Sequence, residues 1–221
     1  MKLNFSTLLA TVMLLLTFCS CRKTETYSCD SNINKWVNEN RDQLQHLTRE
    51  QLVSYQSVDS QFAVYRALTP EAKCAVWKRK MEIVSNEYGL TEAENAHIRK
   101  VINFAKPEFW GERKNELKQW GAEWERNAMT QFGWDTAKTV LIAETWLTGP
   151  ELQHLKELKT KGSPTNANAS RAYIPPPDPD CTCNYSIYCA LGSAGVCLTG
   201  ACSTASGCGF LGNGDCKGRC G

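Results

Sequence analysis

The chain has few histidines and no excess of charge of either sign. It is 221 residues long, with three histidines, 25 basic residues and 23 acidic residues, which gives a formal net charge of +2. Proteins that bind nucleic acid usually concentrate lysine and arginine in a stripe or patch, and no such stripe is visible here. We therefore expect no nucleic-acid partner.

Signatures of catalysis and of metal binding are also missing. His46, His97 and His154 each stand alone on a helical pattern, without the two-histidine spacing of a metal-binding helix. There is no nucleophile elbow, no phosphate-binding glycine loop and no carboxylate pair that stands out from the general supply of glutamate. The sequence predicts a protein that is not an enzyme and holds no cofactor or metal. A wall hydrolase, or a thiol-reactive role for Cys29 or Cys74, is the enzymatic alternative.

Long apolar runs are absent except at the N-terminus. The segment from Leu8 to Phe18 follows Lys2 and is nearly all apolar, but it is too short to span a bilayer. A positive end followed by a short apolar core is typical of a secretory signal. We therefore predict that residues 1–20 are a signal peptide and that the rest of the chain is soluble.

The end of this signal resembles the lipobox of bacterial lipoproteins. Cys21 has the bulky Phe18 three residues before it and the small Ser20 immediately before it. Cys19 fits badly, because Phe18 directly precedes it and is too large. We predict that Cys21 carries the lipid, palmitate included, and anchors the chain to a membrane, with residues 21–30 as a tether. Several acyl chains hold a protein stably where a single chain binds only marginally. An ordinary cleaved signal is the alternative.

Composition divides the rest of the chain into two parts joined by a linker. Residues 31–161 contain one cysteine and mostly helix formers, whereas residues 181–221 contain eight cysteines, many glycines and few charges. Residues 162–180 begin small and polar and end in a proline run at 175–179, which favours a stiff, extended spacer. The sequence predicts a helical domain at 31–161, a linker at 162–180 and a Cys-rich module at 181–221.

The first part is expected to form an all-α bundle of six to eight short helices. One helix should begin at Thr69-Pro70, end at Gly89 and bury a stripe of residues spaced four, three and four apart. A capping box at Thr91 and Glu94 predicts the start of the next helix. The buried stripe of the helix from Pro70 is Trp77, Met81, Val84 and Tyr88. Two other groups are each expected to share one helical face: Ile33, Trp36, Val37 and Leu44, and Trp110, Leu117, Trp120 and Trp124. Asp135 and Thr148 are the candidate caps of two last helices. The basic cluster Lys78-Arg79-Lys80 is expected to be a solvated face.

The Cys-rich module is too short to fold on a hydrophobic core alone. In an exported chain with an even number of cysteines, disulfides are the default. We therefore expect a loop-dominated, disulfide-rich module, although the sequence does not choose the pairing. A metal cluster is the alternative, but no Cys-x-x-Cys occurs and the module has no histidine. The candidate cysteines are Cys181, Cys183, Cys189, Cys197, Cys202, Cys208, Cys216 and Cys220.

Two further cysteines lie before and within the helical part. Cys29 and Cys74 are predicted to pair with each other, because two cysteines in one exported domain are more often bonded than free. Two separate buried thiols are the alternative.

The layout as a whole resembles a known family. The chain combines a lipoprotein signal, the segment Y-R-A-L-T-P-E-A-K at 65–73 followed by Trp77, and an end rich in glycine and cysteine. These features are similar to the bacteriocin fulvocin C-related proteins, which come mostly from Bacteroidota. The family is named for a small disulfide-rich antibacterial peptide. The resemblance implies an antibacterial role but no catalytic residues.

Two functions follow as expectations. In the first, a protease cuts the linker of a bacteriocin-type precursor and releases the Cys-rich peptide, which acts on the envelope of a competing cell. In the second, the protein stays anchored and its Cys-rich module binds a ligand as a head on a stalk. The residues after Cys21, Arg22 to Glu25, lack the acidic pair that marks surface export in Bacteroidota. We therefore expect the cell envelope as the location, at the periplasmic face of the outer membrane, with a secreted C-terminal fragment in the first case.

Overall fold

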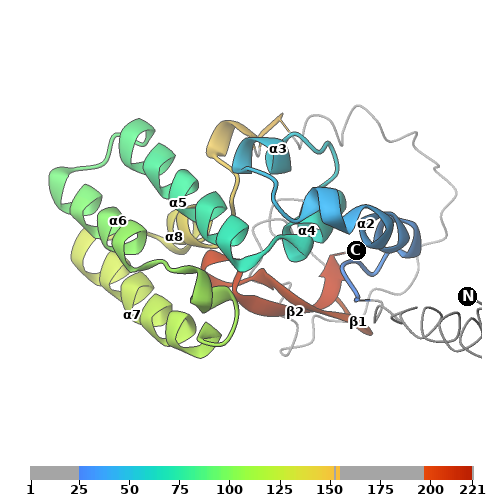
Figure 1. The fold of residues 1–221 in the computed structure, drawn as a ribbon. Helices are drawn as coiled ribbons and strands as arrows, with labels where there is room; N and C mark the ends of the chain where they lie inside the picture. The colour runs from blue at the N-terminus through green and yellow to red at the C-terminus, as the bar shows by residue number, and fades with distance from the viewer. Residues whose placement is uncertain (1–24, 152, 155–196, 221) are drawn as a thin grey trace, which may run out of the picture.

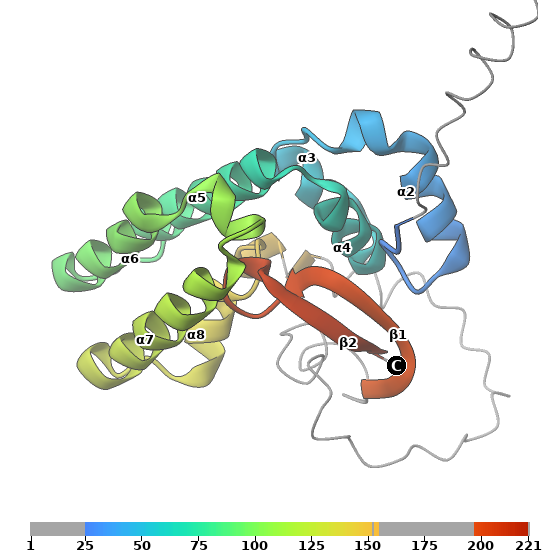
Figure 2. The same cartoon turned by 60° about the horizontal axis from the view of Figure 1, so that its bottom comes forward.

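A computed structural model describes residues 25–151, 153–154 and 197–220 of the chain. The signal peptide, the lipidated Cys21, the linker at 162–180 and the cysteines Cys181, Cys183 and Cys189 lie outside these residues. The described part is mostly helical, with a small two-stranded region near the C-terminus (Figures 1 and 2). The helices are α2 (Ser31–Leu44), α3 (Arg49–Val53), α4 (Val58–Ala67), α5 (Pro70–Glu87), α6 (Glu92–Phe104), the 3-10 turn η1 (Pro107–Trp110), α7 (Lys114–Phe132) and α8 (Thr136–Ala143).

Local capping signals set the starts of these helices where the sequence places them. The Thr69 side chain accepts from the Ala72 amide and Pro70 is the first residue of α5. Thr91 and Glu94 form the predicted capping box of α6. Asp135 caps α8 through the Lys138 amide. Thr148 precedes a helical turn at 149–151, where its amide donates to Glu151. Each cap satisfies amides that have no partner inside the helix.

The expected stripe from Trp110 to Trp124 does not lie on one helix. Trp110 ends the turn η1, and Gly111 then adopts φ −132° and ψ −115°, far from helical values. The helix α7 begins only at Lys114 and ends at Gly133, which is left-handed with φ +65°. Trp110 is therefore free to point away from α7 and to contact another part of the molecule.

The C-terminal region forms an antiparallel hairpin instead of a loop-dominated module. Strand β1 (Cys197–Cys208) pairs with β2 (Gly214–Cys220), with Thr204 opposite Cys216 and Cys208 opposite Gly214. The short turn η3 (Phe210–Gly212) lies at its tip. No pattern in the sequence predicts these strands, because their residues are mostly small and polar and do not alternate with apolar ones.

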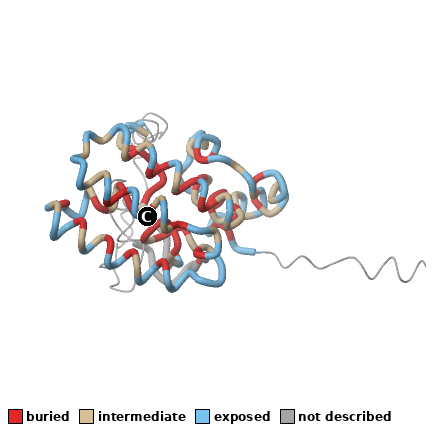
Figure 3. The backbone as a smooth tube through the Cα atoms, turned by 60° about the vertical axis from the view of Figure 1, so that its left-hand side comes forward, coloured by how far each residue is buried: buried red, intermediate tan, exposed pale blue. Residues whose placement is uncertain are grey.

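The tip of the hairpin is part of the core of the helical domain. Strand β1 contacts α4, and η3 contacts α7, so that the hairpin lies along the helices with its tip among them (Figure 2). Leu211 is fully buried, and Phe210 belongs to the same core cluster as Trp77, Met81 and Trp124. Figure 3 shows the buried residues gathered on the inward sides of the helices. The helical part and the end of the Cys-rich segment thus share one hydrophobic core.

A glycine on α7 makes room for this tip. A Cβ at Gly121 would lie 2.5 Å from the Phe210 ring, and the backbone-proximal atoms of Phe210 leave it little freedom to move. We predict that Gly121→Ala destabilises the protein by about 1–2 kcal/mol, since the strain of overpacking outweighs the better helix propensity of alanine. Gly149→Ala is the control, because no atom lies within 4 Å of its Cβ position, and it should change stability by less than about 0.5 kcal/mol. Chemical denaturation measures both; equal effects would show that the tip does not pack against α7.

Candidate functional site

The hydroxyl of Tyr65 is the point where the helices meet the hairpin tip. It accepts from Trp77 Nε1 at 2.9 Å and from Trp110 Nε1 at 3.0 Å, and it donates to the carbonyl of Leu211 at 3.1 Å. A phenol has one donor and two acceptor positions, so every hydrogen-bonding position of this group is used. Tyr65 is fully buried, and burial raises its pKa well above the usual value. We call Phe210–Asn213 the clasp tip. The tip together with Tyr65, Trp77, Trp110 and Gly121, which form the site that receives it, is called the clasp.

The tip packs closely against Tyr65 because residue 212 has no side chain at the place that the Tyr65 hydroxyl occupies. Gly212 has φ +60°, and a Cβ there would lie 2.8 Å from Tyr65 Oη. Any other residue at 212 would be strained in its backbone and would collide with the tyrosine. Trp110 Nε1 also lies 3.1 Å from the Leu211 carbonyl, which is the interaction that the break at Gly111 permits.

Polar side chains surround the clasp and hold the strands. Arg66 donates to the carbonyl of Ser206 at 3.1 Å and to that of Tyr27 at 2.8 Å, which joins the N-terminal segment to β1 through α4. On the opposite side, Asn213 donates to the carbonyl of Lys114 at 2.7 Å. Lys73 is buried beside Arg66, and both burial and this neighbouring cation lower its pKa to about 8. These contacts fix the hairpin to α4 and to the start of α7.

The cysteines pair differently from the sequence expectation. Cys208 and Cys216 form a disulfide that closes the loop carrying the clasp tip, which confirms a bond within the Cys-rich segment. Cys74 is a buried free thiol, and Cys29 is bonded to a cysteine other than Cys74, Cys208 or Cys216. The predicted Cys29–Cys74 bond is therefore wrong. Cys74 lies inside α5 in the interior, where burial raises the pKa of its thiol, whereas Cys29 belongs to the segment that Arg66 and the start of α2 hold.

The pairing of the remaining candidates stays a prediction. Cys197 and Cys202 belong to β1 and Cys220 belongs to β2. Cys197 is opposite Cys220 in the register. Cys181, Cys183 and Cys189 lie outside the described residues.

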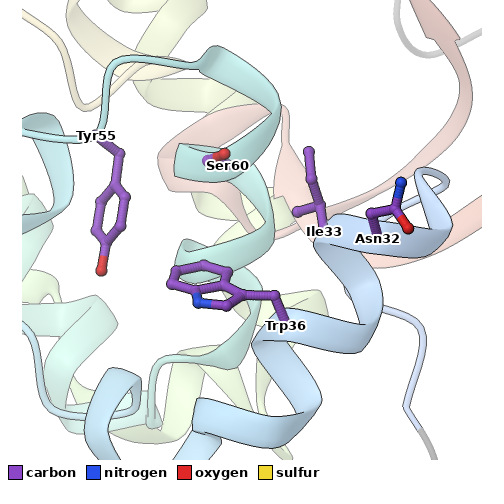
Figure 4. A pocket seen from close by; sticks show the side chains of 5 residues that line it. All are labelled: Asn32, Ile33, Trp36, Tyr55 and Ser60. Carbon is purple, nitrogen blue, oxygen red and sulfur yellow. The ribbon is translucent and has the colours of Figure 1, made fainter.

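A partly exposed aromatic surface lies on the face formed by α2, α4 and the segment after α3. Asn32, Ile33, Trp36, Tyr55 and Ser60 line a shallow depression of about 340 Å³. Figure 4 shows the Trp36 indole between Tyr55 on one side and Ile33 and Asn32 on the other, with Ser60 on the neighbouring helix. The two rings meet edge to face, with centroids 5.8 Å apart. We call these five residues the aromatic shelf; all of them are uncharged.

The sequence placed Trp36 on one helical face with Ile33, Val37 and Leu44, and the structure leaves Trp36 at the exposed edge of that face. Val37 and Leu44 are buried as expected, but Trp36 is 37% exposed. Trp36 directly precedes Val37 and therefore lies at the edge of the apolar stripe. Its position at that edge is the only signal from which its exposure could have been inferred.

The basic cluster at 78–80 is not uniformly solvated either. Lys80 is fully buried, and its ammonium donates to the carbonyl of Leu147. Burial and the nearby Arg49 lower the pKa of Lys80 to about 7. Arg49 in turn donates to the Trp146 carbonyl at 2.9 Å and pairs with Glu151. These two cations hold the segment after α8 against α3 and α5, which is a structural role.

The histidine in the core is also structural. His97 stacks on Trp124 with centroids 4.5 Å apart, and one ring nitrogen lies 3.1 Å from the Trp124 carbonyl. Burial lowers its pKa. In the part of the chain that the structure describes, no group of histidine, cysteine, aspartate or glutamate side chains could hold a metal ion. Within the same residues, no helix has the length and apolar character needed to cross a membrane.

Comparison with known proteins gives no relative for this chain. No family model, no curated protein and no solved structure matches it.

Two buried carboxyl groups lie between α7 and the end of α8. Glu125 and Glu144 each have an oxygen that is buried and has no hydrogen-bond partner within the described residues. Burial raises the pKa of both to about 7, and Glu125 adds to the effect at Glu144. In the unfolded chain a glutamate ionises near 4.3, so the native state binds more protons between about pH 4.5 and 7. As far as these two groups are concerned, the free energy of unfolding is therefore highest below this window and falls as the pH rises through it.

We predict that Glu144→Gln leaves stability nearly unchanged at pH 4 and raises it by about 2 kcal/mol at pH 8, since glutamine mimics the neutral acid and cannot ionise. Urea denaturation at both pH values tests this. Glu123→Gln, on the exposed side of α7, is the control and should show no such difference between the two pH values. A pH-independent effect at Glu144 would contradict the burial of an ionisable carboxyl there.

Proposed function

We propose that this protein is an exported, lipid-anchored protein of the cell envelope that binds a neutral glycan, and that it works with its Cys-rich segment in place. The insertion of the clasp tip into the helical core is the observation that carries this proposal. A segment that completes the core of its neighbour is suited to a permanent unit.

Removal of the tip would cost free energy both in the tip and in the helical core that it leaves. Full burial of a residue such as Leu211 or Phe210 contributes about 1.5–3 kcal/mol. Tyr65 and Trp110 would lose their shared acceptor, the Leu211 carbonyl, and an unsatisfied buried polar group costs about 1–3 kcal/mol. These penalties support the anchored alternative over a peptide that is released by one cut.

The chemistry of the aromatic shelf supports a glycan as the ligand. The flat faces of Trp36 and Tyr55 can contact the apolar side of a sugar ring, while Asn32 and Ser60 offer an amide and a hydroxyl to its hydroxyl groups. Binding sites commonly combine aromatic walls with a few polar groups that fix orientation. Because none of the five lining residues is charged, the shelf suits a neutral saccharide better than an acidic one. A lipid anchor at Cys21 on the periplasmic face of the outer membrane would place the shelf near the glycan strands of the wall.

The bacteriocin-type precursor is the second candidate. The resemblance to fulvocin C-related proteins and the composition change at 162–180 favour it. In that case the clasp would keep an apolar tip, Phe210 and Leu211, covered until the peptide is released.

We predict that Trp36→Ala abolishes co-sedimentation of the mature protein with purified, insoluble wall glycan and lowers its stability by no more than about 2 kcal/mol, since 37% of the residue is exposed and a fully buried tryptophan would cost about 3–5 kcal/mol. Met129→Ala is the matched control, because Met129 on α7 is 39% exposed and lies away from the shelf. Equal sedimentation of both variants and the parent would overturn the assignment of the shelf. Absence of sedimentation in all three would overturn glycan binding.

A second experiment separates the two candidate functions. A specific protease site introduced into 162–180 and cut in the purified mature protein should yield two pieces that still elute together in size-exclusion chromatography. A denaturing gel without reductant tells whether they are also joined covalently, as the disulfide of Cys29 allows. Elution of the Cys-rich piece alone, or its appearance in the culture medium of producing cells, would favour the precursor.

A further inference from the structure

The disulfide Cys208–Cys216 lies at the base of the loop that carries the clasp tip. Cys208 ends β1 and faces Gly214 in the register, and Cys216 faces Thr204. The four residues of the tip lie between the two cysteines, so the bond closes a short ring around them. A disulfide of this kind acts mainly by restricting the unfolded chain.

The tip needs such a restriction because its backbone is unusual. Leu211 has φ +48° although it is not glycine, and Gly209 and Gly212 have φ +68° and +60°. A leucine in the left-handed region is disfavoured in a free peptide. In this conformation the Leu211 side chain is buried while its carbonyl accepts from Tyr65 and Trp110. An open loop would populate the inserting conformation rarely.

We propose that Cys208–Cys216 is a redox-dependent latch for the whole helical domain: the oxidised form inserts the clasp tip and closes the core, and the dithiol form leaves the core open. Helix α4 supplies Tyr65, α5 supplies Trp77 and η1 supplies Trp110, and α7 supplies the space beside Gly121 that the Phe210 ring fills. Tyr65, Trp110 and Gly121 contact the tip directly, and Trp77 is joined to it through the Tyr65 hydroxyl, so the state of one bond is transmitted to these four elements.

The latch closes in one direction. The thiolate of one cysteine attacks the disulfide of a thiol–disulfide oxidant and releases one of its sulfurs as a thiolate. The second cysteine then attacks the mixed disulfide and releases the other. The latch loses two electrons and two protons, and the oxidant becomes a dithiol. Once folded, Cys208 and Cys216 are 7% and 3% exposed, so a reductant cannot reach the bond until the tip withdraws.

This direction of closure gives the latch a role in timing. Thiols stay reduced in the cytoplasm and oxidise in the envelope, so a newly made chain would keep an open core until after export. The timing rests on the proposed export, but the latch itself does not depend on that export or on glycan binding.

The test compares the oxidised mature protein with Cys208→Ala/Cys216→Ala by amide hydrogen exchange. We expect exchange at the amides of α4 and of the first turns of α7 to accelerate roughly 50-fold, the loss of chain restriction for a ring of this size. Cys74→Ala is the control for replacing a buried cysteine that is not in a disulfide, and it should accelerate exchange in α7 far less than the double variant does. Faster exchange confined to the hairpin, with α4 and α7 unchanged, would overturn the latch.

A second comparison covers the case in which the double variant does not fold. Leu211→Ala keeps the disulfide but removes the buried side chain of the tip. If the disulfide acts through the tip, reduction in mild denaturant should accelerate exchange in α4 much less in Leu211→Ala than in the parent protein, because coupled sites are not additive. Equal effects of reduction in both proteins would mean that the bond stabilises the hairpin alone.

Discussion

The fold depends on the saturated hydroxyl of Tyr65. This one group joins α4, α5, η1 and the hairpin, through two indole donors and one backbone carbonyl. A buried hydroxyl whose donor and acceptor positions are all used stabilises the fold. It also makes the fold sensitive to change, because the loss of any partner leaves a buried polar group unsatisfied. The surrounding glycines at 121 and 212 show how the chain makes space for it. Through this contact, residues more than 140 positions apart belong to one core.

Buried ionisable groups hold other parts of the chain. Lys80 and Arg49 hold the carbonyls of Leu147 and Trp146, and thereby the segment that leads out of the domain. Glu125 and Glu144 lack hydrogen-bond partners for a buried oxygen within the described residues. Isolated buried charges shift their pKa values instead of staying ionised. The helical domain is thus fixed by a few polar contacts whose strength varies with pH, in addition to its aromatic core.

The clasp and the aromatic shelf are the two features on which the proposed anchored, glycan-binding function rests. Arg66 links the N-terminal segment at Tyr27 to β1 at Ser206, so these two parts of the chain lie beside the same end of α4. The shelf is formed by the first helices after that segment (Figure 4). Release of the Cys-rich segment as a diffusible peptide would require this clasp to open.

The sequence by itself determined the helical class, the caps at Thr69, Thr91 and Asp135, and the presence of a disulfide in the C-terminal segment. These features arise from neighbours a few residues apart, and local chemistry is legible in a single chain. Tertiary structure alone decided that Trp36 is exposed, that Lys80 is buried and that Cys74 does not bond Cys29. It also decided that the end of the Cys-rich segment is not a separate module. Its strands have no apolar alternation, and the tip is buried only because Tyr65, Trp110 and Gly121, distant in sequence, form the site that receives it.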